Sequence, residues 1–294
     1  MDTAMTMNRR KSSRGLLTDG RFAKLRRKNP AFFAGMLMVA FVIVMAIIGP
    51  AIAPYDPTDQ NYGETLEPPS AKHWLGTDKF GRDILSRILY ATRIDLQIGV
   101  LCVLFPFIIG VALGAVSGYY GGVIDVVLQR IVDLVVAFPF FVLVIAIIAI
   151  LGTGVENIYI AITIVGWIAY AKIVRGEVLV AKNEEYALAA RGLGYSDARI
   201  ILRHLLPNVI TPAIVFAMTD VVLCILAAAA LGYLGLGVQP PTPEWGVMIS
   251  DGREFVASAW WIATFPGLAI AIVGIGFSLV GDGLADLLRP GSRS

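Results

Sequence analysis

The first long apolar stretch of the chain covers residues 31–53, which read AFFAGMLMVAFVIVMAIIGPAIA. No charged residue interrupts it. A helix of about 20 residues crosses the roughly 30 Å of hydrocarbon in a bilayer. A secretory signal peptide has a shorter apolar run of about 7–15 residues. The stretch therefore predicts an uncleaved transmembrane helix.

The whole composition agrees with this prediction. The 294 residues are 57% hydrophobic and 16% charged, whereas soluble domains carry about 25% charged residues. The predicted spans are 31–53, 96–118, 127–151, 157–174, 209–236 and 261–281. The predicted divisions are a basic tail (1–30), a first helix with an outside segment (31–95) and a five-helix core (96–290). The sequence predicts an all-α membrane protein with six transmembrane helices.

The distribution of basic residues predicts the orientation. Nine of the 24 Lys and Arg residues lie in the first 28 positions, and five lie in the polar segment 175–208. Segment 54–95 holds five basic and seven acidic residues, and segment 237–260 holds one basic residue, Arg253. Cytoplasmic loops of membrane proteins are enriched in Lys and Arg. We therefore expect both termini in the cytoplasm, and membrane lipid rather than nucleic acid beside the basic tail.

The longest polar segment on the predicted inside is 182–208, which reads KNEEYALAARGLGYSDARIILRHLLPN. Asn183 can cap a helix, and Glu184 and Glu185 suit its positive N-terminal end. Gly194 can end that helix in a left-handed conformation. This pattern predicts a short helix followed by a tight turn.

A second short helix is expected after the turn. Ser196 or Asp197 can cap it, and it should stop near Pro207. Two short helices at a turn form a compact knob that could dock into a groove of a soluble partner. The same knob could instead pack only on its own subunit, and the residues by themselves leave both alternatives open.

The segment resembles the EAA motif of ABC-importer permeases, written EAA-x3-G-x9-I-x-L-P. The matching residues are Ala189, Ala190, Gly194, Leu206 and Pro207, at the motif's spacing. In two places the chain departs from the motif, because Leu188 stands for the Glu and His204 for the Ile. Glu184 or Glu185, one turn earlier, can substitute for the missing carboxylate.

Other stretches narrow the resemblance to C-type permeases of the dipeptide, oligopeptide and nickel importers. They are LGTDKFGRDILSR (75–87), LGYLGLGVQPPTPEWG (231–246), FPGLAI (265–270) and KNP (28–30). The resemblance implies a type I ABC importer permease fold and a place in a bacterial or archaeal inner membrane. It further implies import of peptides or a related small solute. The implied partners are a B-type permease, ABC ATPase subunits and an extracytoplasmic solute-binding protein.

By the same resemblance, the loop 182–208 couples this chain to the ATPase. The residues expected to do so are Glu184, Glu185, Ala189, Ala190, Gly194, Leu206 and Pro207. The chain itself contains no phosphate-binding loop, since it has no Gly-Lys dipeptide. We therefore expect no catalysis and no bound cofactor or metal in this chain, with ATP and magnesium held by its partners.

Asp220 is the acidic residue placed deepest in a predicted span. Ionisable residues at membrane depth are costly and often functional. Asp220 can line the translocation path, or it can hydrogen-bond a neighbouring helix. If the chain were a self-sufficient secondary transporter or channel, which is the alternative function, Asp220 would be its main coupling candidate.

The predicted outside surface offers two further features. The proline-rich stretch around Gln239, Pro240, Glu244 and Trp245 cannot form regular helix, and we expect it to face the solute-binding protein. The alternative for Trp245 is that it marks the membrane interface, together with Trp260 and Trp261. The charged cluster of Asp78, Arg82 and Asp83 is expected to have a structural role, as a capped turn that leads into a helix. The alternative is a contact with a solute-binding protein or a gate element.

Overall fold

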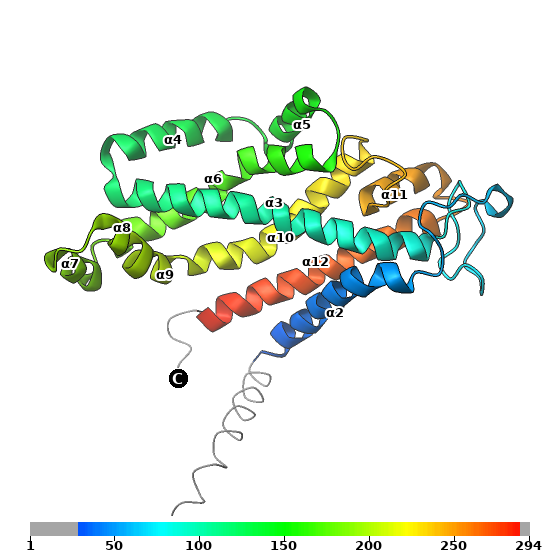
Figure 1. Ribbon diagram of the computed structural model, residues 1–294, viewed down its shortest axis with the longest axis horizontal. Coiled ribbons are helices and arrows are strands. Elements are labelled where there is room, and N and C mark those ends of the chain that lie inside the picture. Colours follow the sequence, from blue (N-terminus) through cyan, green and yellow to red (C-terminus); the bar gives the residue numbers. More distant parts are fainter. Residues whose placement is uncertain (1–28, 289–294) are drawn as a thin grey trace, which may run out of the picture.

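The computed structural model describes residues 29–288, and most of the predicted basic tail lies outside that range. Within the described range the structure is helical, with a single isolated β-bridge between Thr77 and Asp83. The helices form an elongated bundle (Figure 1). The predicted all-α fold is confirmed.

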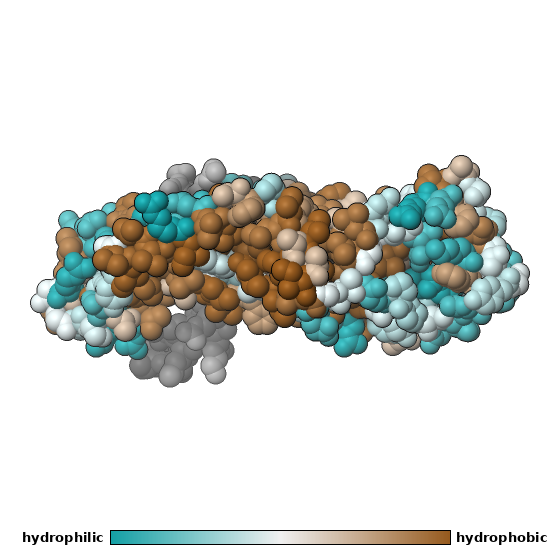
Figure 2. All heavy atoms as spheres, turned by 90° about the horizontal axis from the view of Figure 1, so that it is seen from above, coloured by the Kyte–Doolittle hydropathy of each residue, from teal (hydrophilic) through white to brown (hydrophobic). Residues whose placement is uncertain are grey.

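Five helices are long and apolar enough to cross a membrane. They are α2 (Pro30–Ile52), α3 (Ile84–Tyr120), α6 (Val155–Ala181), α10 (Thr211–Tyr233) and α12 (Trp261–Leu288). Figure 2 shows a hydrophobic middle between two more hydrophilic ends. This is the profile of a membrane-spanning bundle. Each of these helices corresponds to one predicted span, and α3 begins 12 residues before the predicted edge at residue 96.

The remaining predicted span, 127–151, is not one straight helix. It consists of α4 (Gly122–Val136) and α5 (Phe140–Leu151), which are bent by 88° relative to each other. Pro139 lies at the break, where it cannot donate a backbone hydrogen bond and disfavours helical geometry at Phe138. Counted as one broken span, the pair brings the number of candidate spans to six.

Helices α3 and α6 approach each other closely through three glycines spaced four residues apart. A Cβ atom at Gly110 would lie 2.3 Å from the carbonyl oxygen of Trp167, and one at Gly114 would lie 2.5 Å from that of Ala171. At Gly118 the corresponding distance to the Arg175 carbonyl is 3.0 Å. Only a residue without Cβ permits such backbone contact.

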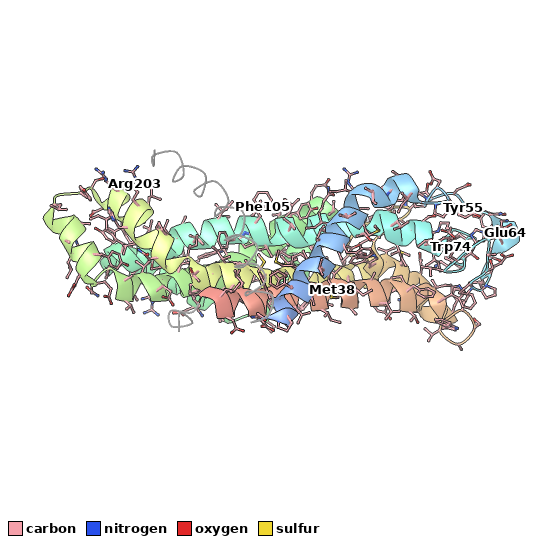
Figure 3. The ribbon with its side chains drawn as sticks, turned by 90° about the horizontal axis from the view of Figure 1, so that it is seen from below. Met38, Tyr55, Glu64, Trp74, Phe105 and Arg203 are labelled. Atoms are coloured by element: carbon pink, nitrogen blue, oxygen red, sulfur yellow. The ribbon has the colours of Figure 1, made fainter. Side chains whose placement is uncertain are left out.

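Short elements occupy the two ends of the bundle (Figure 1). At one end lie α7 (Glu185–Gly192), α8 (Asp197–Arg199), the π-helical η2 (Ile200–Leu205) and α9 (Leu206–Val209). At the other end lie η1 (Tyr62–Glu64), α11 (Trp245–Gly252) and η3 (Arg253–Phe255). Figure 3 shows Arg203 at the first end, and Tyr55, Glu64 and Trp74 at the second. We call them the α7 end and the α11 end.

Candidate functional site

The α7 end carries the predicted knob, which we define as residues 184–209. Helix α7 ends at Gly192, and Gly194 adopts the left-handed conformation with φ of 76°. The backbone N–H of Gly194 donates to the Arg191 carbonyl at 3.0 Å, and that of Tyr195 donates to the Ala190 carbonyl at 3.3 Å. The predicted turn at Gly194 is confirmed.

One detail of the predicted capping is wrong. Glu184, not Asn183, occupies the N-cap position of α7, and the Asn183 side chain donates to the Leu179 carbonyl at 3.0 Å. Pro207 lies in the first turn of α9, and the helical run ends at Val209, close to the predicted stop near Pro207. A proline is tolerated there, since the first-turn N–H groups have no intrahelical partner.

One face of the knob packs on its own subunit. The Tyr119 hydroxyl at the end of α3 donates to an Asp197 carboxylate oxygen at 2.6 Å, and the Arg191 guanidinium lies 5.5 Å from the Tyr119 ring centre. Lys182 Nζ donates to the Gly118 carbonyl at 2.8 Å, which ties the end of α6 to α3. The buried residues of the knob are Ala187, Ala190, Ile200, Ile201, Leu205 and Val209.

The opposite face of the knob is exposed. Of the predicted coupling residues, Ala190 is buried, Leu206 is half-buried, and the exposed ones are Glu184, Glu185, Ala189, Gly194 and Pro207. Three apolar side chains that the sequence interpretation did not select share this exposure: Leu188 at 49%, Leu193 at 72% and Leu202 at 65%. Their apolar character within a polar segment was the signal that could have found them.

Asp220 lies within α10, and its predicted hydrogen bond to a neighbouring helix is confirmed. The Tyr170 hydroxyl of α6 donates to Asp220 Oδ2 at 2.7 Å. Asp220 also lines a cavity of about 700 Å³, beside Cys102 and Cys224. Both cysteines are buried free thiols.

The predicted receptor-facing residues at the α11 end divide into two groups. Gln239 and Pro240 are exposed. Glu244 is 1% exposed and Trp245 is fully buried, so the expectation that these two face a receptor is wrong. The Glu244 carboxylate accepts from the N–H groups of Gly246 at 2.7 Å and Val247 at 2.8 Å. It therefore caps α11, a role that buries it beneath the surface.

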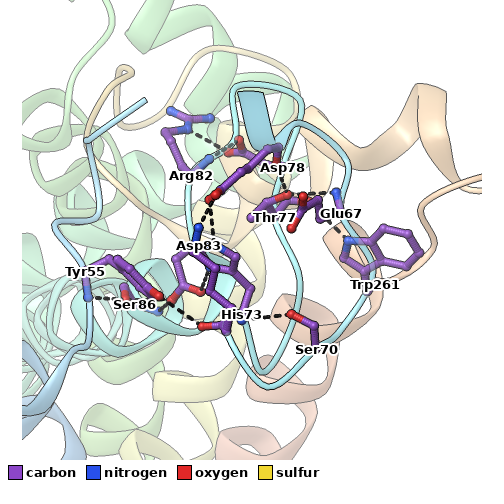
Figure 4. Close-up of polar contacts among 12 residues, drawn as sticks. Tyr55, Glu67, Ser70, His73, Thr77, Asp78, Arg82, Asp83, Ser86 and Trp261 are labelled. Atoms are coloured by element: carbon purple, nitrogen blue, oxygen red, sulfur yellow. Dashed lines mark hydrogen bonds and ion pairs between the residues drawn. The ribbon is translucent and has the colours of Figure 1, made fainter. Parts of the chain in front are cut away.

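The charged cluster at this end has the structural role predicted for it (Figure 4). Asp83 caps α3 by accepting from the Ser86 N–H at 2.8 Å. Arg82 Nε donates to Asp78 at 2.6 Å, and Arg82 Nη2 donates to Asp251 at 3.0 Å. The pair of Arg82 with Asp251, which is partly buried, joins the segment before α3 to α11.

His73 completes the cluster. Its Nδ1 lies 2.9 Å from Asp83 Oδ1, and its Nε2 lies 3.0 Å from Glu64 Oε2. Burial disfavours the charged imidazole, but the hydrogen bonds to these two carboxylates outweigh burial and raise the pKa of His73 above its ordinary value. Among the described residues no group of three His, Cys, Asp or Glu side chains is arranged to hold a metal ion.

The apolar helices, with more hydrophilic elements at both ends of the bundle, define a polytopic membrane protein. The chain belongs to the family of binding-protein-dependent transport system inner membrane components, which matches residues 110–294. Residues 24–69 match the N-terminal transmembrane domain of oligopeptide transport permease C.

Individual relatives agree with this assignment. The chain is 44% identical over 271 residues to a dipeptide transport system permease of Alkalihalophilus pseudofirmus, covering 92% of this chain and 89% of that one. It is 42% identical over 269 residues to a glutathione transport system permease of Pectobacterium atrosepticum, covering 91% and 89%. An inward-facing structure of the MetNI methionine ABC transporter matches with a TM-score of 0.56 at 18% identity, covering 69% of this chain and 97% of that one. That likeness concerns the fold.

Proposed function

We propose that this chain is a non-catalytic permease subunit of an ATP-driven importer of peptides. The observation that carries the proposal is the 44% identity, over nearly the whole chain, to a dipeptide transport permease. The exposed knob at the α7 end supports it, because apolar side chains such as Leu193 are exposed there beyond the hydrophobic middle of the bundle. ATP and magnesium belong to partner subunits.

The knob is the proposed contact with the ATPase. Its exposed face carries Glu184, Glu185, Ala189, Gly194 and Pro207, with half-buried Leu206 at the edge and buried Ala190 behind it. Helix α6 leads into the knob and α10 leaves it. When ATP binding closes the ATPase pair, movement of the knob is transmitted to these two membrane helices.

The remaining partners follow from the same proposal. A second, B-type permease completes the path, and a solute-binding protein docks at the α11 end, where Gln239 and Pro240 are exposed. The α7 end, with both termini, lies in the cytoplasm of a bacterium or archaeon, and the bundle lies in its inner membrane. The positive-inside distribution of Lys and Arg supports this orientation.

Purification tests the proposal directly. The full chain with a C-terminal tag is solubilised in detergent, pulled down and analysed by mass spectrometry, with an ATPase assay on the same sample. Recovery of an ABC ATPase and a second permease, with vanadate-sensitive hydrolysis, is the expected result. Recovery of a stable chain alone, without ATPase activity, would contradict the proposal and favour a secondary transporter.

A further inference from the structure

A cavity of about 700 Å³ lies among the broken span α4–α5, α6 and α10. Most of its wall is apolar, with Val135, Phe138, Phe141, Ile162 and Leu223 among the lining residues. Cavities of about 300–1,000 Å³ with apolar walls and a few polar groups are typical small-molecule sites. The volume of the cavity therefore suits a small peptide. The polar groups that line the cavity determine which end of the peptide binds where.

Two charged side chains line the cavity, Lys172 of α6 and Asp220 of α10. Lys172 precedes the last residue of α6, Ala181, by nine positions, and Asp220 follows the first residue of α10, Thr211, by nine positions. Both helices reach the knob at these ends, so each charge lies about 14 Å along its helix from the α7 end. The cavity thus holds a cation and an anion at similar depth.

Neither charge is neutralised by another charged side chain within the described part of the chain. Among the described residues Lys172 makes no hydrogen bond or ion pair, and Asp220 accepts one hydrogen bond, from the neutral hydroxyl of Tyr170. Charges at membrane depth are expensive unless they face a cavity or a partner. A ligand with both an ammonium and a carboxylate group would satisfy the two together.

Tyr170 acts as a positioning residue in this arrangement. It is fully buried, and its ring packs edge-on against Phe107 at 5.5 Å and Phe216 at 5.1 Å. A ring held in this way fixes the hydroxyl that binds Asp220 Oδ2. The other carboxylate oxygen, Oδ1, remains available for a ligand among the described residues.

We propose that Asp220 and Lys172 form a subsite for a zwitterionic peptide in the membrane. Asp220 pairs with the α-ammonium group and Lys172 pairs with the α-carboxylate, while the apolar wall accepts varied side chains. The inference rests on the proposed function, because it assumes that peptides pass through this subunit. It adds which atoms of the peptide are recognised and by which residues.

The test measures protection of a cavity cysteine in the detergent-solubilised importer complex without its solute-binding protein. Leu223, which is 51% exposed and lines the cavity, is replaced by Cys in a Cys102→Ala/Cys224→Ala background, and alkylation by an uncharged maleimide is timed. The probes are Ala-Ala, its N-acetyl form and its C-terminal amide. Ala-Ala should protect at concentrations about tenfold lower than either blocked form, which corresponds to about 1.4 kcal/mol.

Charge variants assign the two ends. Asp220→Asn should remove the preference over the N-acetyl peptide, and Lys172→Gln should remove the preference over the amide. Asp220→Glu keeps the negative charge and should retain the preference for Ala-Ala over the N-acetyl peptide. That result would show that Asp220→Asn loses the preference through loss of charge and not through misfolding. The matched control is Glu254→Gln, at an exposed position outside the cavity, which should change nothing.

Equal protection by all three peptides, or none by any, would overturn the subsite. So would an Asp220→Asn variant that keeps its preference for the free amine. These results leave the proposed function intact if the unmodified complex with its solute-binding protein still takes up peptides with ATP. Failure to recover any ATPase would instead contradict the proposed function.

Discussion

His73 is held between two carboxylates, Asp83 and Glu64, and its charged form donates to both. A neutral imidazole has one N–H, so it leaves one carboxylate facing a lone pair. Because the pKa of His73 is raised on folding, its contribution to stability is complete below the unfolded value of about 6.5. That contribution is lost as the pH rises through the higher folded value.

His73→Gln should therefore lower the melting temperature of the detergent-solubilised protein more at pH 5.5 than at pH 9. Thermal unfolding followed by intrinsic fluorescence measures this difference. The control is His204→Gln, because His204 stacks on Tyr195 at 5.6 Å rather than between carboxylates. A His73 effect that is equal at both pH values would show that the ring contributes by packing alone.

At the scale of single elements, the turn of the knob depends on Gly194. Nothing lies within 4 Å of a Cβ built there, so a larger residue would meet no steric clash. The cost of a substitution comes only from the left-handed φ of 76°. Gly194→Ala should destabilise the turn by about 1–2 kcal/mol. Gly192, at the end of α7, is equally open but has no left-handed φ, and Gly192→Ala is the matched control.

Gly194→Pro is the more severe change, because proline cannot adopt this φ and loses the N–H that donates to Arg191. We expect ATP-driven uptake to be abolished in proteoliposomes while the protein still inserts in the membrane. Uptake at the full rate would refute the coupling role of the knob.

The contact between α3 and α6 is the second feature at this scale. Gly114→Ala would place a methyl group 2.5 Å from the Ala171 carbonyl oxygen, which forces the two helices apart. We expect a loss of about 1–3 kcal/mol from overpacking, seen as a lower melting temperature in detergent. Gly176→Ala on α6, where a Cβ would meet nothing within 4 Å, should not lower it. Equal effects of both substitutions would contradict the close approach.

At the scale of the whole molecule, Asp251 joins α11 to the segment before α3. It pairs with Lys79 and Arg82, each at 3.0 Å. Asp251→Asn should reduce stability by about 1–3 kcal/mol, because Arg82 is buried and loses a charged partner. Glu254→Gln nearby, where the side chain is 72% exposed, should stay within about 0.5 kcal/mol in the same thermal assay. Indistinguishable melting temperatures for the two variants would show that the ion pairs are not needed.

The sequence by itself determined the class of fold and the position of the knob. An apolar run as long as 31–53 is not stable outside a bilayer, so it predicts a transmembrane helix. A glycine followed by a second capping signal predicts the turn at Gly194. These are local properties, decided by hydropathy and by backbone geometry within a few residues. Properties that depend only on neighbouring residues can be predicted from the sequence alone.

The tertiary structure decided which residues are buried and which distant segments of the chain meet. Glu244 looks like a surface residue in a proline-rich loop, yet it is buried because α11 folds back against α10 and α3. Lys172 and Asp220, whose charged side chains line one cavity, lie 48 positions apart in the chain, and no local pattern relates them. Residues on both sides of the break at Pro139, such as Val135 and Phe141, line a cavity only because α6 and α10 supply other parts of its wall. The surroundings of a side chain depend on the segments that fold around it.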